Sequence, residues 1–537
     1  MSRRASSITV GGAVCIIATF GVIASAQEVS REDLLDGLTN PQRWLSYSGD
    51  YTGQRNSPLK EITTENVRRL APRWTFQTGV LGKFETTPIV IDGILFVTGQ
   101  DNHAWALDAR TGRAIWHYRK PLPDLLNVCC GSVNRGFAIY RDRLYMATLD
   151  ARLVALDAKT GSLIWDVDIA DPERGYSATA APLVVKDMVV VGVAGAEYGT
   201  RGFLDAYDTG TGMRRWRFWT VPEPGKPGGD TWAGDAWERG GGSTWLTGTY
   251  DPELNLIYWG TGNPGPDLLG EVRPGDNLYT DSVVALDADS GELRWYYQFT
   301  PHDTHDWDSN QVPVLADIEG ESGTRKLLML ANRNGFFYTL DRTNGELLVG
   351  KPFVHTTWAT EIGPDGRPIL LPNNTPSAEG TFTCPDVEGA TNWMSPSFNP
   401  STGWLYVTAR EACATFYAWP QEFIEGQYYF GGTYRPSGPR AYSALRAIDP
   451  LTAEVKWEFK YFTASMGGTL STDGGLVFGG DMDGNVMAFD ARTGENLWHF
   501  QTGASIWAAP ITYMLDGTQY VMIPSGTTLF AFALPKE

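Results

Sequence analysis

The chain has 537 residues, of which 42% are hydrophobic and 20% charged, a composition typical of a globular protein and unlike that of a disordered one. Its 20 tryptophans, 60 glycines and 32 prolines favour many short strands joined by tight turns, so we expect an all-β fold. The formal net charge of −19 argues against a nucleic-acid partner; it would keep the protein soluble or attract a basic protein partner, and charge alone does not decide between the two.

The N-terminus has the pattern of a secretory signal peptide. Arg3 and Arg4 precede an apolar run over residues 8–23, and Ala-Ser-Ala at 24–26 forms a small-residue cleavage site. A single membrane anchor is the alternative, but the run is short for a membrane span. The sequence therefore predicts a signal peptide over residues 1–26, export to the periplasm, and one mature domain over residues 27–537.

Four of the five cysteines lie outside this predicted signal peptide: Cys129, Cys130, Cys384 and Cys413. An even number in an oxidising compartment suggests disulfides. No Cys-x-x-Cys-His motif occurs, so a covalently attached c-type haem is excluded.

An internal repeat is the strongest pattern in the chain. Each copy reads as a strand that ends at an Asp, a Thr-Gly turn or its equivalent, and a second strand that leads to a Trp. The clear copies are ALDARTGRAIW, ALDAKTGSLIW, AYDTGTGMRRW, ALDADSGELRW and AFDARTGENLW, which end at residues 116, 165, 216, 295 and 498; degenerate copies end at Val349 and Trp457. A spacing of about 50 residues leaves room for four short strands, the size of a propeller blade.

The repeat predicts an eight-bladed β-propeller. An eighth half-copy, LAPRWTFQTG, lies near the N-terminus, and its missing half is the C-terminal strand LFAFAL at 529–534. Pairing of the two ends would close a ring and remove exposed sheet edges, whereas tandem β-sandwiches would have no need of it. The segment from Thr375 to Gly438, rich in Pro, Gly and aromatics, is expected to be a loop insertion over one face.

Four segments outside the repeat carry candidate chemistry. Glu197 is a lone acid in GVAGAEYGTRG, where an ordinary surface glutamate is the alternative. YWGTGNPGPD matches a dinucleotide-binding Gly-x-Gly-x-x-Gly pattern, but its prolines forbid the required helix, which leaves Asn263 as a neutral oxygen ligand or a turn residue. Arg333, in ANRNGFF, could cap a turn or clamp an anion.

The fourth segment, PHDTHDWDSN, is rich in acids. In an extended segment Asp306 and Asp308 would share one side and Trp307 would take the other. Paired carboxylates suit a hard cation that prefers oxygen ligands, and a solvated polar loop is the alternative. His302 and His305 bring zinc to mind, but no cysteine or third histidine lies nearby in the sequence.

Together, the tryptophan repeats, the adjacent cysteines and these segments resemble the quinoprotein alcohol dehydrogenases, eight-bladed propellers that use pyrroloquinoline quinone (PQQ). The resemblance runs from LSYSGDYTGQRNSPL to the final repeat. It implies oxidation of a small alcohol to an aldehyde, with electrons passed to a soluble cytochrome c. It also implies a disulfide between the neighbours Cys129 and Cys130 against one face of the quinone, Trp245 on the other face, and a separate Cys384–Cys413 bridge.

The same resemblance assigns roles to further residues. Asp306 would be the base that takes the alcohol proton as hydride passes to the quinone, and Arg333 would hydrogen-bond the reacting quinone oxygen. The metal ligands would be Glu197, Asn263, Asp306 and Asp308. The other cofactor contacts would come from Glu85, Arg135, Thr179, Gly195, Ala196 and Asn392.

The resemblance leaves the metal and the substrate open. In members that prefer lanthanides a second aspartate stands where Asp308 stands here, so a lanthanide(III) ion is expected, with Ca²⁺ as the alternative because the flanking residues differ from the commonest context. Leu268 and Leu269 replace a bulky tryptophan of some methanol-specific members, which is compatible with larger alcohols. Action on sugar or polymeric alcohols, and a non-catalytic propeller scaffold, are the two other hypotheses.

Overall fold

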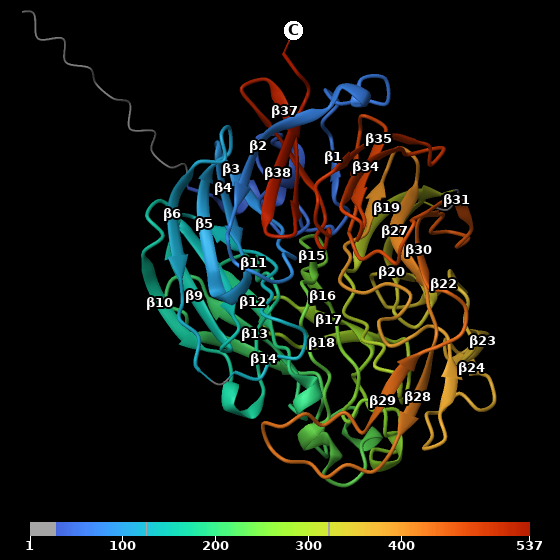
Figure 1. Cartoon of the computed structure of the whole chain (residues 1–537). Helices are drawn as coiled ribbons and strands as arrows, with labels where there is room; N and C mark the ends of the chain where they lie inside the picture. The colour runs from blue at the N-terminus through green and yellow to red at the C-terminus, as the bar shows by residue number, and fades with distance from the viewer. Residues whose placement is uncertain (1–27, 125, 321–322, 537) are drawn as a thin grey trace, which may run out of the picture.

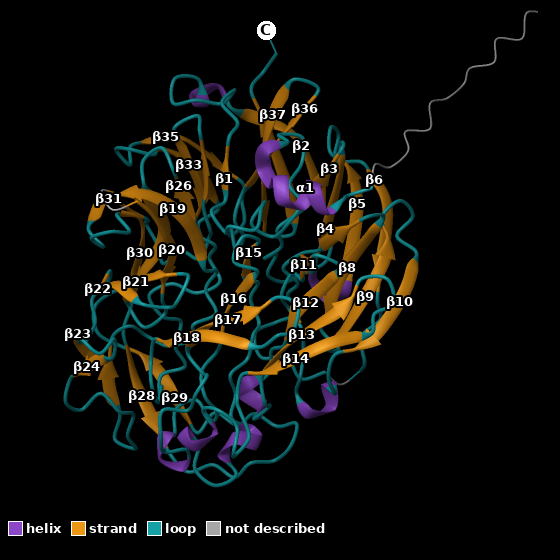
Figure 2. Ribbon diagram, turned by 180° about the vertical axis from the view of Figure 1, so that it is seen from behind, coloured by secondary structure: helices purple, strands orange, loops and turns teal. Residues whose placement is uncertain are grey.

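The computed structural model describes residues 28–124, 126–320 and 323–536, and strands and loops make up nearly all of it (Figure 2). The predicted signal peptide lies outside the described residues. No helix in these ranges is long and apolar enough to cross a membrane. The helices are α1 (Arg31–Asp36) and the short 3-10 helices η1 (Gly37–Thr39), η2 (Val67–Arg69), η3 (Gln100–Asn102), η4 (Pro172–Arg174), η5 (Ala196–Tyr198), η6 (Gly229–Thr231), η7 (Ala236–Arg239) and η8 (Gly270–Val272).

Eight sheets of four or five strands dominate the fold, as expected for an all-β chain. Five of them are four-stranded antiparallel meanders of consecutive strands: β3 (Ile89–Ile91), β4 (Ile94–Thr98), β5 (His103–Asp108) and β6 (Ala114–Arg119); β7 (Ala138–Tyr140), β8 (Arg143–Thr148), β9 (Arg152–Asp157) and β10 (Leu163–Asp168); β11 (Leu183–Val185), β12 (Met188–Gly192), β13 (Phe203–Asp208) and β14 (Arg214–Trp219); β15 (Thr249–Asp251), β16 (Leu256–Gly260), β17 (Ser282–Asp287) and β18 (Leu293–Gln298); β19 (Val314–Gly320), β20 (Gly323–Ala331), β21 (Phe336–Asp341) and β22 (Leu347–Pro352).

The remaining three large sheets combine strands that are further apart in the sequence. They are β26 (Ser397–Asn399), β27 (Trp404–Glu411), β30 (Tyr442–Ile448) and β31 (Val455–Lys460); β1 (Asn56–Ser57) with β32 (Leu470–Thr472), β33 (Leu476–Gly480), β34 (Asn485–Asp490) and β35 (Asn496–Gln501); and β2 (Ala71–Gln77) with β36 (Ile511–Leu515), β37 (Thr518–Ser525) and β38 (Thr528–Ala533). Two small sheets are added: β23 (Ala359–Ile362) with β24 (Pro368–Leu370), and β25 (Thr381–Thr383) with β28 (Ala414–Ala418) and β29 (Gly432–Pro436).

The inner strands of the large sheets are buried and the outermost strand of each is more exposed. Every residue of β12, β16 and β33 is buried. By contrast, β6, β10 and β31 consist of exposed and half-buried residues. The core therefore lies between neighbouring sheets and around their first strands.

The repeat motif forms the hairpin between the last two strands of a sheet and docks it on the preceding sheet. Gly161, between β9 and β10, has φ +72°, and a Cβ on it would lie 2.7 Å from the ring of Trp116, which ends the preceding copy. The indole Nε1 of Trp116 donates to the carbonyl oxygen of Ala158, at 3.0 Å. Only glycine has both the backbone freedom and the small size for this contact. The same glycine–tryptophan pairing recurs at Gly112–Trp74, Gly212–Trp165, Gly291–Trp216, Gly345–Trp295 and Gly494–Trp457.

The two ends of the chain meet in one sheet, as the split repeat predicts. Strand β2 pairs antiparallel with β38, with Trp74 opposite Ala531. In Figure 1 the blue strand β2 lies beside the red strands β37 and β38 at the top of the molecule. The indole of Trp498 donates to the carbonyl oxygen of Leu70 at 3.1 Å, which links the sheet of β32–β35 to the start of β2.

The predicted insertion over residues 375–438 is too broad. Strands β26 and β27 lie inside that range and belong to a large sheet with β30 and β31. The long connection between β27 and β30 contains β28 and β29, so it separates the first two strands of this sheet from its repeat hairpin. This separation hides the sheet in the sequence.

Candidate active site

The antiparallel order of the sheets gathers two kinds of loop at one end. The segment that enters the first strand of a sheet and the loop that joins its second and third strands lie at the same end, because neighbouring strands run in opposite directions. The entering segments carry Glu85 before β3, Arg135 before β7, Thr179 before β11, Trp245 before β15, Asp306 and Asp308 before β19, and Asn392 before β26. The second-to-third loops carry Glu197 (β12–β13), Asn263 (β16–β17) and Arg333 (β20–β21).

A cavity of about 310 Å³ lies where these loops converge, a size typical of a site for a small ligand. Twelve of the fourteen residues that the sequence proposes for the site line it; the other two, Ala196 and Asn263, do not. Its lining consists of Lys83, Glu85, Val128, Cys129, Cys130, Gly131, Val133, Arg135, Ser177, Thr179, Ala194, Gly195, Glu197, Ser243, Trp245, Asp306, Asp308, Arg333, Val387, Glu388, Asn392, Trp393, Tyr428, Phe430 and Tyr434.

Arg135 is the centre of one polar network in the cavity. Its Nη2 lies 2.6 Å from Glu85 Oε2, and its Nη1 donates to Thr179 Oγ1 at 2.8 Å. The guanidinium carbon is 4.8 Å from the centre of the Trp245 ring, a cation–π distance. Arg135 and Glu85 are almost fully buried, and Arg135 joins its own loop to those of Glu85 and Thr179, which belong to different sheets.

Arg333 is the centre of a second network. Its Nη1 donates to Asp308 Oδ2 at 2.5 Å, and its Nη2 lies 3.6 Å from Asp306 Oδ2 and also donates to the carbonyl oxygen of Val387. Asp308 Oδ2 accepts a further bond from Trp245 Nε1 at 3.1 Å. Burial raises the pKa of both aspartates, and Arg333 opposes that rise.

A third aspartate, Asp303, holds the loop that carries Asp306 and Asp308. Asp303 accepts hydrogen bonds from the backbone nitrogens of His305 and Trp307, at 3.0 and 2.8 Å. Trp307 is fully buried on the far side from the cavity, which confirms the expected split of Asp306 and Asp308 from Trp307. The segment is not a strand, however, because Asp306 adopts φ +62°.

His305 packs within this loop and does not face the cavity. Its ring stacks on Trp307 with centroids 4.2 Å apart, and Nε2 lies 2.8 Å from the carbonyl oxygen of Asn374. His302 Nδ1 lies 2.9 Å from the carbonyl oxygen of Gly275. His302 and His305 therefore form contacts that stabilise the loop.

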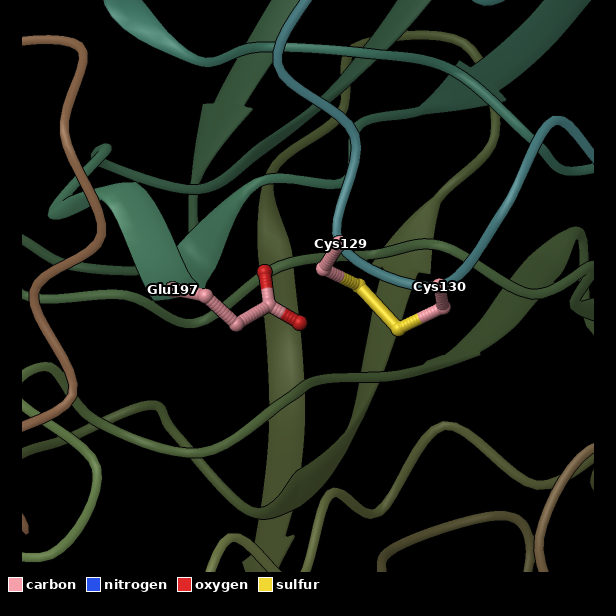
Figure 3. A group of neighbouring side chains, drawn as sticks. All are labelled: Cys129, Cys130 and Glu197. Carbon is pink, nitrogen blue, oxygen red and sulfur yellow. A yellow bond between two sulfur atoms is a disulfide. The ribbon is translucent and has the colours of Figure 1, made fainter. Parts of the chain in front are cut away.

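Glu197 lies beside a disulfide between adjacent residues. Figure 3 shows its carboxylate directed toward the Cys129–Cys130 bridge. The two sulfurs and one carboxylate oxygen lie within 4.8 Å of one another, and this is the single group of three such possible ligand atoms among the described residues. Disulfide sulfurs are not thiolate ligands, so within this trio only the Glu197 carboxylate could bind a metal ion. Burial, together with the nearby Asp308 carboxylate, raises the pKa of Glu197 to about 7.

Asn263 lies next to the lining, and Gly195 is part of it. The backbone nitrogen of Asn263 donates to Asp308 Oδ1 at 3.0 Å, so Asn263 is adjacent to the acidic group although it does not line the cavity. Gly195 has φ +116°, and a Cβ there would meet the carbonyl oxygen of Gly175 at 2.1 Å. The turn that presents Glu197 therefore requires glycine.

The second disulfide lies outside the cavity. Cys384 pairs with Cys413, with Cα atoms 4.3 Å apart. It joins the segment that follows β25 to the start of β28, at the base of the connection that brings Tyr428, Phe430 and Tyr434 to the cavity. Both predicted pairings are therefore present.

Several lining residues were missed by the sequence analysis: Lys83, Glu388, Trp393 and the aromatics of the β27–β30 connection, Tyr428, Phe430 and Tyr434. Lys83 and Trp393 are near neighbours of Glu85 and Asn392, so the motifs that contain those residues could have pointed to them. The three aromatics had no such signal, because nothing in a long connection indicates which part folds back.

The donor set fits an oxygen-rich, anionic, planar ligand together with a cation. The Nε atoms of Arg135 and Arg333 are buried without a hydrogen-bond partner among the described residues, and buried donors of this kind call for an acceptor. The lining contains five carboxylates and three basic side chains. A further anion would leave a large excess of negative charge, which a hard cation at Glu197, Asp306 and Asp308 would offset.

Comparison with known proteins points the same way. A family model described as the β-propeller domain of glucose, ethanol and alcohol dehydrogenases, with the short name PQQ, matches residues 44–351 and 438–521. The stretch between the two matched parts contains the long β27–β30 connection.

Similar proteins cover nearly the whole chain. A quinoprotein alcohol dehydrogenase of Pseudomonas putida is 39% identical over 96% of this chain and 91% of its own length. A lanthanide-dependent methanol dehydrogenase of Methylacidiphilum fumariolicum is 36% identical over 95% and 89%. The solved structure of a europium-containing methanol dehydrogenase superposes with a TM-score of 0.88 at 32% identity, covering 94% of this chain and all of that one.

Proposed function

Since the chain belongs to the PQQ-dependent alcohol dehydrogenases, a family of oxidoreductases, we propose that it oxidises a small alcohol to an aldehyde with pyrroloquinoline quinone held in the cavity described above. The observation that carries the proposal is the convergence in one cavity of the adjacent disulfide, Trp245, Arg135, Arg333 and three acids. A scaffold propeller would have no use for buried, unpaired guanidinium donors in a cavity.

The cofactor fits the groups present. PQQ is a planar quinone with three carboxylates, which suits the flat surfaces of Trp245 and the Cys129–Cys130 bridge and the cationic Arg135. Glu85, Thr179 and Asn392 supply polar contacts around it, and Gly195 and Ala196 let the backbone approach. When bound, the quinone supplies the electron-pair acceptor and a neighbouring metal ion makes its carbonyl more electrophilic.

Asp306 acts as the base that removes the hydroxyl proton of the alcohol. Its raised pKa makes it a better proton acceptor than an exposed aspartate, and Arg333 at 3.6 Å stabilises the charged form that must be present before the reaction. The free Nε of Arg333 is available to a ligand oxygen, while its two Nη groups are held by Asp308, Asp306 and Val387.

The metal site consists of Glu197, Asn263, Asp306 and Asp308. Three carboxylates favour a trivalent ion, so we propose a lanthanide(III), with Ca²⁺ as the alternative. The europium-containing and lanthanide-dependent methanol dehydrogenases named above support this choice.

Membership of this family also supports proposals for the closed architecture, the location, the electron acceptor and the substrates. The eight large sheets are proposed to be the eight blades of one closed propeller over residues 27–537, after removal of a signal peptide over 1–26 in the periplasm. A soluble cytochrome c would accept the electrons, because the sequence has no haem-attachment motif. The net negative charge would attract a basic cytochrome. Sugar and polymeric alcohols are the alternative substrates.

The test is reconstitution of the apo-protein with PQQ and either La³⁺ or Ca²⁺, followed by dye-linked oxidation of ethanol. We expect turnover with La³⁺ and little or none with Ca²⁺. Activity with Ca²⁺ alone would keep the enzyme and reject the lanthanide preference. No turnover with either metal on ethanol, larger alcohols, sugars or a polymeric alcohol would reject the proposed function.

A further inference from the structure

Lys83 occupies a defined position at the edge of the cavity. It lies in the segment that enters β3 and lines the cavity, where it is partly buried. Its Nζ is 5.3 Å from the ring centre of Trp393 and 5.1 Å from that of Trp507. The two indoles stack with centroids 6.1 Å apart, and Trp393 Nε1 donates to the carbonyl oxygen of Trp507 at 3.0 Å. The ammonium group is therefore held by two aromatic rings at a fixed place.

Lys83 differs from the other two basic residues of the lining. Arg135 is paired with Glu85, and Arg333 with Asp306 and Asp308. Lys83 forms no ion pair with another described residue. Its charge acts on Glu85, whose pKa burial raises and Lys83 helps to lower. Aromatic rings stabilise an ammonium without using up its three N–H donors, since they attract the charge through their faces. Its donors thus stay available to a ligand.

We propose that Lys83 binds a carboxylate of the cofactor at the Trp393–Trp507 side of the cavity. This inference rests on the proposed function and assigns a binding role to a residue of this chain that had none. A bound carboxylate would complete the coordination of an ammonium that the protein itself leaves without an anionic partner. Partial burial keeps such a pair less screened by salt than a pair on the open surface.

Binding of PQQ to the apo-protein, measured by equilibrium dialysis with La³⁺ or Ca²⁺ present, tests the inference without any need for turnover. Lys83→Met removes the charge and keeps the apolar stem. We expect it to weaken PQQ binding by about 10- to 100-fold, the effect of losing a hydrogen bond to a charged group. Lys83→Arg, which keeps the charge, should stay within about threefold of the native affinity, as expected if charge rather than packing is what matters.

Lys460→Met is the matched control, because the Nζ of Lys460 lies 4.7 Å from the ring of Tyr442 and neither residue lines this cavity. It should bind PQQ as the native chain does. Native affinity in Lys83→Met would overturn the inference alone. Equal losses in Lys83→Met and Lys83→Arg would also overturn it, by showing that shape is what matters. If the native chain takes up no PQQ with either metal, the proposed function itself fails.

Discussion

Asp306 shows how one side chain can be prepared for proton transfer. It faces the cavity from a backbone position with φ +62°, and burial raises its pKa while Arg333 opposes the rise. Asp303 holds the loop through the backbone nitrogens on either side, at His305 and Trp307. The proposed base is therefore held in a hydrogen-bonded loop, and burial and Arg333 together set its pKa.

Asp306→Asn keeps the size of this side chain and removes its basicity. We expect turnover of ethanol by the reconstituted protein to fall by at least about 100-fold, the usual contribution of a general base. The PQQ affinity should change much less than turnover, because the amide oxygen of the new side chain can still bind the proposed metal ion and Arg135 and Trp245 do not contact Asp306. Steady-state rates and equilibrium dialysis on the same preparation measure both. Near-native turnover in Asp306→Asn would show that another group takes the proton.

At the residue scale, the sequence could predict the members of the site but not their contacts. The motif match proposed Arg135, Glu85 and Thr179 separately, and nothing in the chain indicates that one guanidinium joins the other two. Asp303 lies in the same acid-rich segment as Asp306 and Asp308, yet its carboxylate accepts hydrogen bonds from two backbone nitrogens and supports the loop. Such contacts depend on the direction in which each side chain points. In a loop no regular periodicity predicts that direction.

The turn of a repeat hairpin requires glycine where the tryptophan of the preceding sheet packs against it. Gly291 has φ +70°, and a Cβ on it would lie 2.5 Å from the ring of Trp216, whose indole donates to the carbonyl oxygen of Ala288 at 3.3 Å. Gly291→Ala should lower the free energy of unfolding by about 1–2 kcal/mol for the backbone conformation and about 1–3 kcal/mol more for the displaced ring.

Gly79→Ala separates the two contributions. Gly79 has φ +72° but nothing lies within 4 Å of a Cβ there, so its replacement carries the backbone cost alone. Urea unfolding followed by tryptophan fluorescence compares the two variants. If Gly291→Ala is no less stable than Gly79→Ala, the docking contact does not contribute to stability.

A buried ion pair joins two neighbouring sheets. Asp251, at the end of β15, accepts from Arg342 Nε at 2.7 Å, and Arg342 Nη1 lies 2.5 Å from Asp317 of β19. Burial raises the pKa of Asp251, but the bonds from Arg342 and from the backbone outweigh this, so the net shift is downward. Asp251→Asn should lower the free energy of unfolding by about 3 kcal/mol at pH 7.

The same pair predicts a pH dependence. A carboxylate whose pKa is lowered by folding stabilises the native state above its unfolded pKa of 3.8, and this contribution is lost as the pH falls through the lower folded value. The difference between the native chain and Asp251→Asn should therefore be constant from pH 7 to about 5 and shrink below about 4. The exposed pair of Asp276 and Arg367 is the control, and Asp276→Asn should cost less than about 1 kcal/mol. A difference that grows on acidification would contradict the assignment.

At the element scale, the hairpins were predictable because each has a turn glycine and a closing tryptophan. The first two strands of the sheets were not, since they lack a repeated motif, and the sheet of β26, β27, β30 and β31 was hidden by the long connection inside it. The repeat hairpins also lie at the end of each sheet opposite the cavity. The repeat that predicts the fold therefore does not predict the site, because the site residues lie in loops of unrelated sequence at the opposite end of the sheets.

The whole molecule depends on the pairing of its two ends. In the sheet of β2, β38, β37 and β36, strand β38 lies between the N-terminal β2 and the rest. Its loss would leave β2 without a partner, expose the edge of β37, and remove buried side chains such as Leu529 and Phe532 from the core. A chain that ends at Thr527 should therefore be unstable as a whole rather than at one sheet, because β2 also carries Trp74, which docks on the hairpin of the next sheet.

Thermal unfolding of this truncated chain, compared with one that ends at Leu534, tests the argument. The longer chain keeps all of β38 and should melt like the native protein. The shorter chain should lose its cooperative transition or aggregate during expression, and an added peptide of residues 528–537 should restore part of the transition by supplying the missing strand. A chain that ends at Thr527 and still unfolds cooperatively at the same temperature as the native protein would contradict this argument. The other sheets would then be stable without pairing of the two ends, even with the edge of β37 exposed and β2 left without its partner strand.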